Sequence, residues 1–284
     1  MLARIVAIAL LICASDMHAA KAQALQTDRI LVEYRPARQP VHALLRDLLM
    51  ERRVLEQVQR LLSPLRLPKP LHFLTADCDG EINAWFETDT VTICYEYIAY
   101  IGELAASRQR PDWVGERDAF AGPLIDVLLH EAGHAVFSYL GVPVFGREED
   151  AADQFSGYML LSLGKQQAPG LVAGITYVYL SEAGLKNFPV RKRWQLRRVD
   201  DRQHADVHST PLQRLYSTLC LASGADPVLF QDVLKRSALP AERAEGCKEE
   251  FQQVHNAFQK LIWPHVDLQA LGQVLNTDTL SLGK

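Results

Sequence analysis

The residues best suited to chemistry lie in the segment LIDVLLHEAGHAVFSYL, residues 124–140. Its apolar background predicts a helix with a buried middle, on which His130 and His134 lie one turn apart on the same face. Two imidazoles at this spacing can bind one ion such as Zn²⁺, and the neighbouring Glu131 can accept a proton from a water molecule on that ion. Gly133 has no side chain, so another helix can pack closely against it.

A catalytic zinc site needs a third protein ligand and an open position. The next predicted helix begins at Glu148 and is rich in carboxylates. Glu149 and Asp153 are four residues apart and share a face. We therefore predict Glu149 as the third ligand and Asp153 as the acceptor of a hydrogen bond from a ligating histidine. Glu148 and Asp150 are alternative ligands, and their other role would be to stabilise the helix N-terminus through its dipole.

The H-E-x-x-H pattern alone has a structural alternative, a surface helix with two histidines that are simply hydrogen-bonded. That alternative would place three polar groups among apolar neighbours with nothing to compensate their charge. These neighbours are Leu128, Leu129, Val136 and Phe137.

HEAGH followed by E-x-x-x-D on the next helix resembles the thermolysin-like zinc peptidases, the gluzincins. This resemblance implies Glu149 as a ligand and Asp153 as the support of a histidine. Residues 83–86 (NAWF) are similar to a sheet-edge stretch that holds an extended peptide in that group. The resemblance thus implies that Asn83 and Ala84 bind substrate by strand addition. An ordinary hairpin strand is the alternative.

More closely, the chain resembles a bacterial family of exported metallopeptidases of unknown function, over essentially all of the mature chain. This resemblance implies a zinc peptidase acting on a peptide or protein. The segments that carry it are residues 78–96, the HEAGH helix, residues 146–154, residues 206–220 and Cys247.

Peptide hydrolysis would also need a donor that stabilises the developing oxyanion. His208, oriented by Asp206, is the candidate, with an exposed or helix-capping role as the alternative. Arg214 would bind substrate carbonyls or pair with an acid. Tyr95 and Tyr97 are further candidate donors.

Composition limits the class of partner. Apolar residues make up 48% and charged residues 23% of the chain, as in ordinary globular proteins, and the net charge of −4 gives no electrostatic basis for binding nucleic acid. The basic run at residues 191–198 is followed by Asp200 and Asp201, so we interpret it as a solvated loop.

The first residues predict export. Arg4 precedes an apolar stretch, residues 5–14, that is too short to span a bilayer, and residues 20–24 fit the small-x-small cleavage rule. We expect a signal peptide over residues 1–22, a single domain over residues 23–284, a periplasmic or secreted location, and no membrane span after cleavage. An uncleaved anchor is the alternative.

Export would leave four cysteines, because Cys13 is removed with the signal peptide. An even number in an oxidising compartment suggests two disulfides, and sequence proximity favours Cys78–Cys94 and Cys220–Cys247. Four buried thiols are the alternative.

The hydrophobic pattern predicts an α+β fold, with a small antiparallel sheet and a mostly helical body that carries the HEAGH helix. Strands are expected at 29–35, 71–77, 81–87 and 90–94, with a hairpin turn at Asp79-Gly80 and Cys94 opposite Asn83. The expected helices cover residues 41–62, 95–106, 121–140, 148–163, 171–183, 212–223, 227–236 and 241–263.

Together these features predict a zinc-dependent peptidase with Glu131 as general base. The alternative is a catalytically silent zinc-containing module in the cell envelope, for binding or inhibition. An intact Glu131 argues against it, because a purely structural zinc site has no use for a base. A second alternative is that the histidines and carboxylates only stabilise an exported domain.

Overall fold

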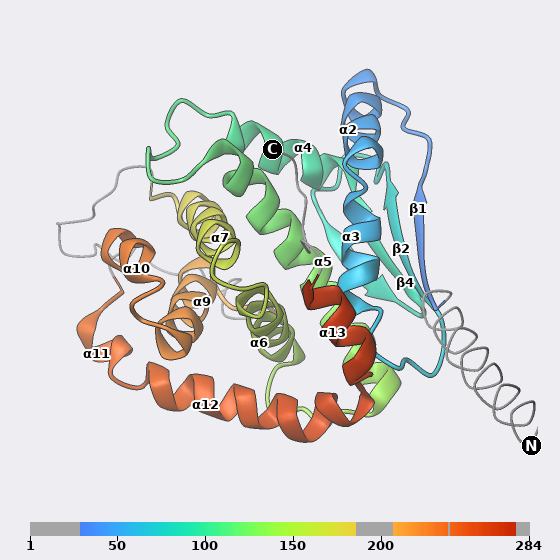
Figure 1. Ribbon diagram of the computed structural model, residues 1–284. Helices are drawn as coiled ribbons and strands as arrows, with labels where there is room; N and C mark the ends of the chain where they lie inside the picture. Colours follow the sequence, from blue (N-terminus) through green and yellow to red (C-terminus); the bar gives the residue numbers. More distant parts are fainter. Residues whose placement is uncertain (1–28, 186–206, 238, 277–284) are drawn as a thin grey trace, which may run out of the picture.

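The computed structural model describes residues 29–185, 207–237 and 239–276 (Figure 1). The predicted signal peptide, the basic run at residues 191–198 and Asp206 lie outside these ranges.

A four-stranded sheet, in the order β1-β2-β4-β3, forms one side of the molecule. Strands β1, β2 and β4 are parallel to one another, and β3 alone runs antiparallel, at the edge beside β4. The strands are β1 (Ile30–Tyr34), β2 (Leu71–Ala76), β3 (Ala84–Glu87) and β4 (Thr90–Cys94). The α+β class with a small sheet and a mostly helical body is therefore confirmed, while the expected all-antiparallel pairing is wrong: the sheet is mixed.

The correction concerns the hairpin expected at Asp79-Gly80. β2 pairs with β4 instead of β3, so this turn lies in a crossover, and the hairpin joins β3 to β4 at residues 88–89. The physical reason is burial. β2 has almost no exposed residue, which is typical of a central strand with neighbours on both sides. The register between Asn83 and Cys94 is as expected, since the Cys94 amide donates to the Asn83 carbonyl at 3.1 Å.

The helices follow the predicted ranges closely around the HEAGH segment and less closely elsewhere. They are α2 (Pro40–Glu51), α3 (Val54–Leu62), α4 (Tyr95–Ala105), α5 (Glu116–Leu140), α6 (Glu148–Leu161), α7 (Ala168–Glu182), α9 (Pro211–Ala225), α10 (Gln231–Ser237), α11 (Ala241–Ala244), α12 (Cys247–Ala257), a π-helical turn (Phe258–Ile262), a 3-10 turn (Trp263–His265) and α13 (Leu268–Asn276).

Two long predicted helices are divided. The one expected at residues 41–62 breaks at Arg53, whose φ of 52° is incompatible with a continuous α-helix. The one expected at residues 241–263 is split between α11 and α12, and α13 is an additional helix. α5 starts five residues earlier than expected, at Glu116, so Pro123 lies inside the helix.

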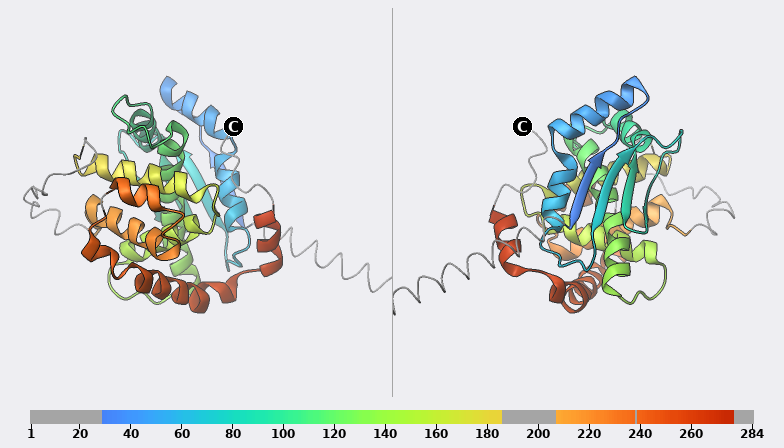
Figure 2. Two further views of the ribbon diagram at one scale, coloured as in Figure 1. Left: turned by 60° about the vertical axis from the view of Figure 1, so that its left-hand side comes forward. Right: turned by 90° about the vertical axis from the view of Figure 1, so that its right-hand side faces the viewer.

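Helix α5 occupies the centre of the fold, between the sheet and the helical body (Figure 1). It contacts β3 and β4 on one side and α4, α6 and α7 on the others. Figure 2 shows α2 and α3 beside the sheet, most of the other helices behind it, and the C-terminal helix α13 below it. The α5–α7 crossing is very close: a Cβ on Gly174 would lie 1.8 Å from the Asp118 carbonyl oxygen, and one on Gly122 would lie 2.4 Å from that of Leu171.

The C-terminal segment returns to the start of the fold. Leu65 and Val266 form an antiparallel bridge, the Arg66 amide donates to the His265 carbonyl, and the Asp267 amide donates to the Pro64 carbonyl. The segment after α12 is thus attached to the end of α3.

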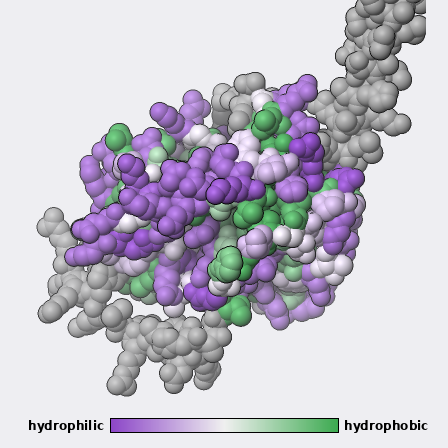
Figure 3. Space-filling model, turned by 90° about the horizontal axis from the view of Figure 1, so that it is seen from below, coloured by the Kyte–Doolittle hydropathy of each residue, from purple (hydrophilic) through white to green (hydrophobic). Residues whose placement is uncertain are grey.

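The surface seen from below is mostly hydrophilic, with a patch of apolar side chains (Figure 3). Within the described ranges, no helix combines the length and the apolar character needed to cross a membrane.

Candidate metal centre and active site

Four ligand-type atoms converge where α5 faces the start of α6. Glu149 Oε2 lies 3.0 Å from His130 Nε2 and 3.4 Å from His134 Nε2, and the two histidine nitrogens are 3.3 Å apart. His208 Nε2 lies 3.0 Å from the same Glu149 oxygen.

These distances fit a zinc ion. Zinc held tetrahedrally at about 2.0–2.2 Å from each ligand atom places those atoms about 3.3–3.6 Å apart. The observed separations of 3.0–3.4 Å are close to that spacing. Two imidazole nitrogens and a carboxylate oxygen are also a ligand set that zinc favours. His130, His134 and Glu149 therefore fit the ion that their sequence spacing predicts.

Close packing of α5 against α6 brings these residues together. A Cβ on Gly133 would lie 3.4 Å from the Ala152 Cα and 3.3 Å from a ring carbon of Phe155, so the two helices meet at a glycine and an alanine. Phe137 and Phe155 pack edge to face beside this contact. The small side chains allow the approach that lets Glu149 reach both histidines.

The outer nitrogens of both histidines have carboxylate partners. His130 Nδ1 lies 2.8 Å from Asp153 Oδ1, the contact that the sequence analysis expects, and His134 Nδ1 lies 2.8 Å from Glu148 Oε1. Such partners fix the ring orientation and the tautomer that leaves Nε2 available. Glu148, an alternative ligand from the sequence, thus lies behind a histidine, and Asp150 is bonded to Arg147 and Ser209.

Asp153 also holds a buried cation. Arg214 on α9 donates from Nε at 2.8 Å and from Nη2 at 2.5 Å to the two Asp153 oxygens, and its guanidinium lies 4.9 Å from the centre of the Tyr179 ring. Of the two roles considered for Arg214, pairing with an acid is the one visible in these contacts. One carboxylate therefore bridges an imidazole and a guanidinium.

The charges of the metal-free site stabilise one another. Burial lowers the pKa of His130, but hydrogen bonds to Asp153 and Glu149 outweigh this effect and raise the pKa to about 9. The hydrogen bond to His130 lowers the pKa of Glu149 to about 2. Burial raises the pKa of Asp153, but hydrogen bonds to His130 and Arg214 and the charge of Arg214 lower it to about 2. Glu149 and Asp153 are therefore ionised, and their negative charges stabilise a cation bound at the site.

Glu131 lies near this network and accepts a hydrogen bond from the backbone amide of Phe86 on β3. Its side chain is buried, and burial raises the pKa of its carboxyl group above the ordinary value, while the backbone amide of Phe86 on β3 partly opposes the shift. A raised pKa brings a carboxylate closer to the range in which it can accept and return a proton.

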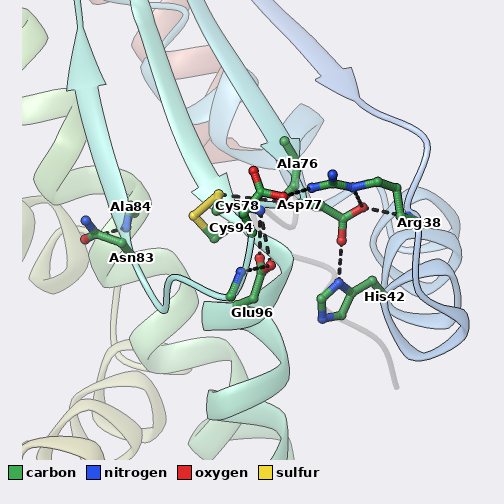
Figure 4. The surroundings of a disulfide bond; sticks show 11 residues. Arg38, His42, Ala76, Asp77, Cys78, Asn83, Ala84, Cys94 and Glu96 are labelled. Carbon is green, nitrogen blue, oxygen red and sulfur yellow. Dashed lines mark hydrogen bonds and ion pairs between the residues drawn. A yellow bond between two sulfur atoms is a disulfide. The ribbon is translucent and has the colours of Figure 1, made fainter.

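The edge strand β3 borders the same space. Because the Asn83 carbonyl is paired with β4, the alternation of antiparallel strands turns the main-chain groups of Ala84 and Phe86 away from β4. The Asn83 side-chain oxygen accepts from the Ala84 amide at 2.9 Å (Figure 4). Asn83 and Ala84, two of the three residues predicted to bind substrate, thus lie at the edge strand beside Glu131.

A disulfide and a carboxylate fix the loop that leads into β3. The structure contains the two disulfides favoured by sequence proximity, Cys78–Cys94 and Cys220–Cys247. Cys78–Cys94 joins the chain just after β2 to the end of β4 (Figure 4). Glu96 accepts hydrogen bonds from the amides of Cys78 and Gly80, so this turn is tied to the start of α4.

The candidate oxyanion donors have different positions. The His208 imidazole is half-exposed and lies at the metal centre, at ligand distance from Glu149. Tyr95 is buried away from the centre, where its hydroxyl donates to the Arg35 carbonyl. Tyr97 lines a cavity next to His130 and Glu131.

That cavity contains residues that the sequence analysis missed, namely Asp126, Tyr179 and Glu182. Asp126 is four residues before His130, so helical spacing gave a weak signal for it. Nothing in the local pattern around Tyr179 and Glu182, which lie on α7, connects them with the HEAGH helix.

Comparison with known proteins gives one match. A family described as "Putative metallopeptidase" matches residues 34–262, which include the predicted ligands, Glu131 and the edge strand. No curated protein and no solved structure matches the chain. Since this match covers most of the chain and the two helices that form the centre, the chain belongs to the family described as "Putative metallopeptidase".

Proposed function

We propose that the protein is a zinc-dependent peptidase of the gluzincin type, with His130, His134 and Glu149 as the zinc ligands and Glu131 as the general base. The observation that carries the proposal is the convergence of one carboxylate oxygen and two imidazole nitrogens, 3.0–3.4 Å apart, beside a buried carboxylate that is not part of the ligand set.

Zinc bound there would lower the pKa of a coordinated water molecule to about 7 and polarise the substrate carbonyl. Glu131 accepts the proton of the attacking water and passes it to the leaving amine. Asp153 and Glu148 hold the two imidazoles in the orientation that presents Nε2. His208 stabilises the negative charge that develops on the carbonyl oxygen.

The edge of β3 positions the substrate in this proposal. An extended peptide adds to the sheet through the outward main-chain groups of Ala84 and the carbonyl of Phe86, while the Phe86 amide stays on Glu131. The Asn83 side chain exchanges its contact with the Ala84 amide for one with the peptide. Main-chain pairing of this kind places a carbonyl beside Glu131 with little dependence on side-chain identity.

The experiment that tests the function compares wild type with Glu131→Gln. Zinc content is measured by metal analysis and hydrolysis with a mixed library of quenched peptides. We expect equal zinc content, chelator-sensitive cleavage by wild type, and at least a hundredfold lower rate for the variant. Glu249→Gln, an exposed change on α12, is the matched control and should cleave like wild type. Equal cleavage by Glu131→Gln and wild type would remove Glu131 from the mechanism.

One observation favours a second candidate, a catalytically silent zinc module. His208 Nε2 is as close to Glu149 Oε2 as His130 is, and a fourth protein ligand would fill the position that catalysis needs open. His208→Ala distinguishes the two. As an oxyanion donor, His208 leaves zinc affinity intact and its loss lowers kcat by about 10²–10³. As a ligand, its loss weakens zinc binding.

We also propose that the chain is exported, with residues 1–22 as a signal peptide and residues 23–284 as one domain. Two disulfides support an oxidising destination. N-terminal sequencing of the protein recovered outside the cytoplasm tests this, and an intact Met1 would contradict cleavage.

A further inference from the structure

A cavity of about 130 Å³ opens directly beside the proposed reaction centre. Its wall includes His130 and Glu131 from α5 and residues 82–84, which lead into the edge strand. The remaining wall comes from the preceding turns of α5, from α4, α7 and α9, and from His208. A peptide lying along β3 with a carbonyl beside Glu131 therefore presents one of its side chains to this cavity. The volume suits a single side chain and is smaller than the pockets that enclose whole small ligands.

Carboxylates dominate the charged groups of the lining. Asp126, Glu131 and Glu182 contribute carboxyl groups, and Arg214 is the one permanent cation among the lining residues that the structure describes. The charge of Arg214 is already committed, because its Nε and Nη2 both donate to Asp153. Asp126 accepts from the hydroxyls of Ser156, at 2.6 Å, and Tyr179, at 3.0 Å. These are neutral donors, and burial raises the pKa of Asp126, so a cation placed beside it would stabilise its ionised form.

The remainder of the lining is apolar and suits an aliphatic stem. Pro123 and Val127 on α5 and Ile175 and Val178 on α7 form this part, together with the ring of Tyr97. A lysine or arginine side chain has this same division, with methylene groups that favour apolar walls and a charged end that needs acceptors. Aromatic rings such as that of Tyr97 also attract cations to their faces.

We propose that this cavity receives a lysine or arginine side chain next to the bond that is cut, and that Asp126 and Glu182 set this preference. This inference rests on the proposed peptidase function and adds a substrate class to it. An acidic side chain is repelled by the same carboxylates, and a leucine side chain supplies them with no cationic partner in a confined space.

The first test uses short Ala/Gly peptides with one variable residue, either Lys, Arg, Leu or Glu. Mass spectrometry locates the bond that wild-type, zinc-loaded protein cleaves, and kcat/KM is measured for each peptide. We expect the Lys and Arg peptides to exceed the Leu peptide by about tenfold or more, with the Glu peptide poorest. Glu182→Gln should reduce the Lys/Leu ratio about threefold or more. Glu249→Gln, an exposed change outside the cavity lining, should leave the ratio as in wild type.

A second readout does not depend on turnover. Binding of the same labelled peptides to zinc-loaded Glu131→Gln protein, with and without Glu182→Gln, is followed by fluorescence anisotropy. Tighter binding of the Lys peptide, weakened by Glu182→Gln, supports the inference. If wild type cleaves none of the peptides but this preference is observed, the proposed peptidase function is wrong and the proposed side-chain preference still holds. Equal affinities for the Lys, Leu and Glu peptides, or a preference for Leu, would overturn the inference whether or not cleavage occurs.

Discussion

At the scale of single residues, the centre depends on one shared carboxylate. Asp153 accepts from His130 on one side and from Arg214 on the other, so it orients a predicted ligand and neutralises a buried cation at the same time. Removing its charge should therefore lower both the affinity for zinc and the stability of the folded protein.

We predict that Asp153→Asn lowers the free energy of unfolding by about 3 kcal/mol, because Arg214 is left as a buried charge without its partner. Zinc affinity should fall about 10- to 100-fold, because His130 loses the group that orients it. Chemical denaturation and competition with a chelator measure the two effects. Asp150→Asn removes a half-exposed partner of Arg147 and is the control, with a change within about 1 kcal/mol. A similar result for both variants would show that Asp153 has no special role.

The protonation of His130 predicts a pH dependence of the metal-free protein. Its pKa is raised to about 9, so its contribution to stability is complete below the ordinary histidine value of about 6.5 and disappears as the pH rises through 9. The pKa values of Glu149 and Asp153 are lowered to about 2. Their contribution to stability is therefore complete above a pH of about 4 and is lost as the pH falls toward 2.

Zinc must displace the proton on His130, so we expect zinc affinity to rise as the pH increases from about 6.5 to 9. Chelator competition at several pH values measures it, together with denaturation of the metal-free protein over the same range. A zinc affinity that does not vary across this interval would contradict the raised pKa of His130.

Local sequence patterns connect the residues of the candidate metal centre better than they connect those of the cavity. His130, Glu131 and His134 are linked by helical spacing, and Glu149 and Asp153 by the same spacing on the next helix. Asp126, Glu182 and Arg214 come together only because α5, α7 and α9 pack against one another. That packing is a tertiary relationship for which the local pattern has no signal, and it also explains why the partner of Arg214 was not identified in advance.

At the scale of elements, the position of α5 depends on glycines at helix crossings. Gly174 on α7 lies against the backbone of Asp118, with a hypothetical Cβ only 1.8 Å from that carbonyl oxygen. Gly102 on α4 is different, because its hypothetical Cβ would make an ordinary 3.8 Å contact with Phe120.

We predict opposite effects of alanine at these two positions. Gly174→Ala should destabilise the protein by about 2–3 kcal/mol, because two helix backbones must move apart. Gly102→Ala should be neutral or stabilise by up to about 1 kcal/mol, because alanine favours the helix and the space is available. Thermal or chemical denaturation of both variants checks this. Equal effects of the two substitutions would contradict the special role of the close helix crossing at Gly174.

Sequence patterns predicted helix boundaries more reliably than strand pairing. The end of α5 and the start of α6 were predicted correctly, since Gly141 and the acidic start of α6 mark these boundaries, whereas α5 begins five residues earlier than predicted. The partner of β2 was wrong, because a turn signal such as Asp79-Gly80 indicates that the chain reverses but not which strand it joins next. Pairing of β2 with β4 depends on burial of β2 within the whole sheet.

At the scale of the whole molecule, the two disulfides stabilise different layers. Cys78–Cys94 joins the chain after β2 to the end of β4 and closes the loop that contains β3, with a sequence separation of 16. Cys220–Cys247 links α9 to α12, with a separation of 27. Loops of this size imply about 3 kcal/mol of stabilisation from each disulfide.

We therefore predict that each double Cys→Ser variant loses about 3 kcal/mol of stability, while their effects on peptide cleavage differ. Cys78→Ser with Cys94→Ser should also raise KM, because the loop that leads into β3 is loosened. Cys220→Ser with Cys247→Ser should leave KM close to that of wild type. Denaturation and steady-state kinetics measure both properties. An equal KM in the two variants would show that the edge strand β3 does not take part in substrate binding.

The attachment of the C-terminal segment to the end of α3 has a consequence for how the chain folds. Arg66 donates to the carbonyl of Val266, a residue 200 positions later in the sequence. Closing so large a loop has a high entropic cost, and contacts of this kind slow folding. We expect the core around α5 to collapse first and this seam to close last, after the residues of the metal centre have already met.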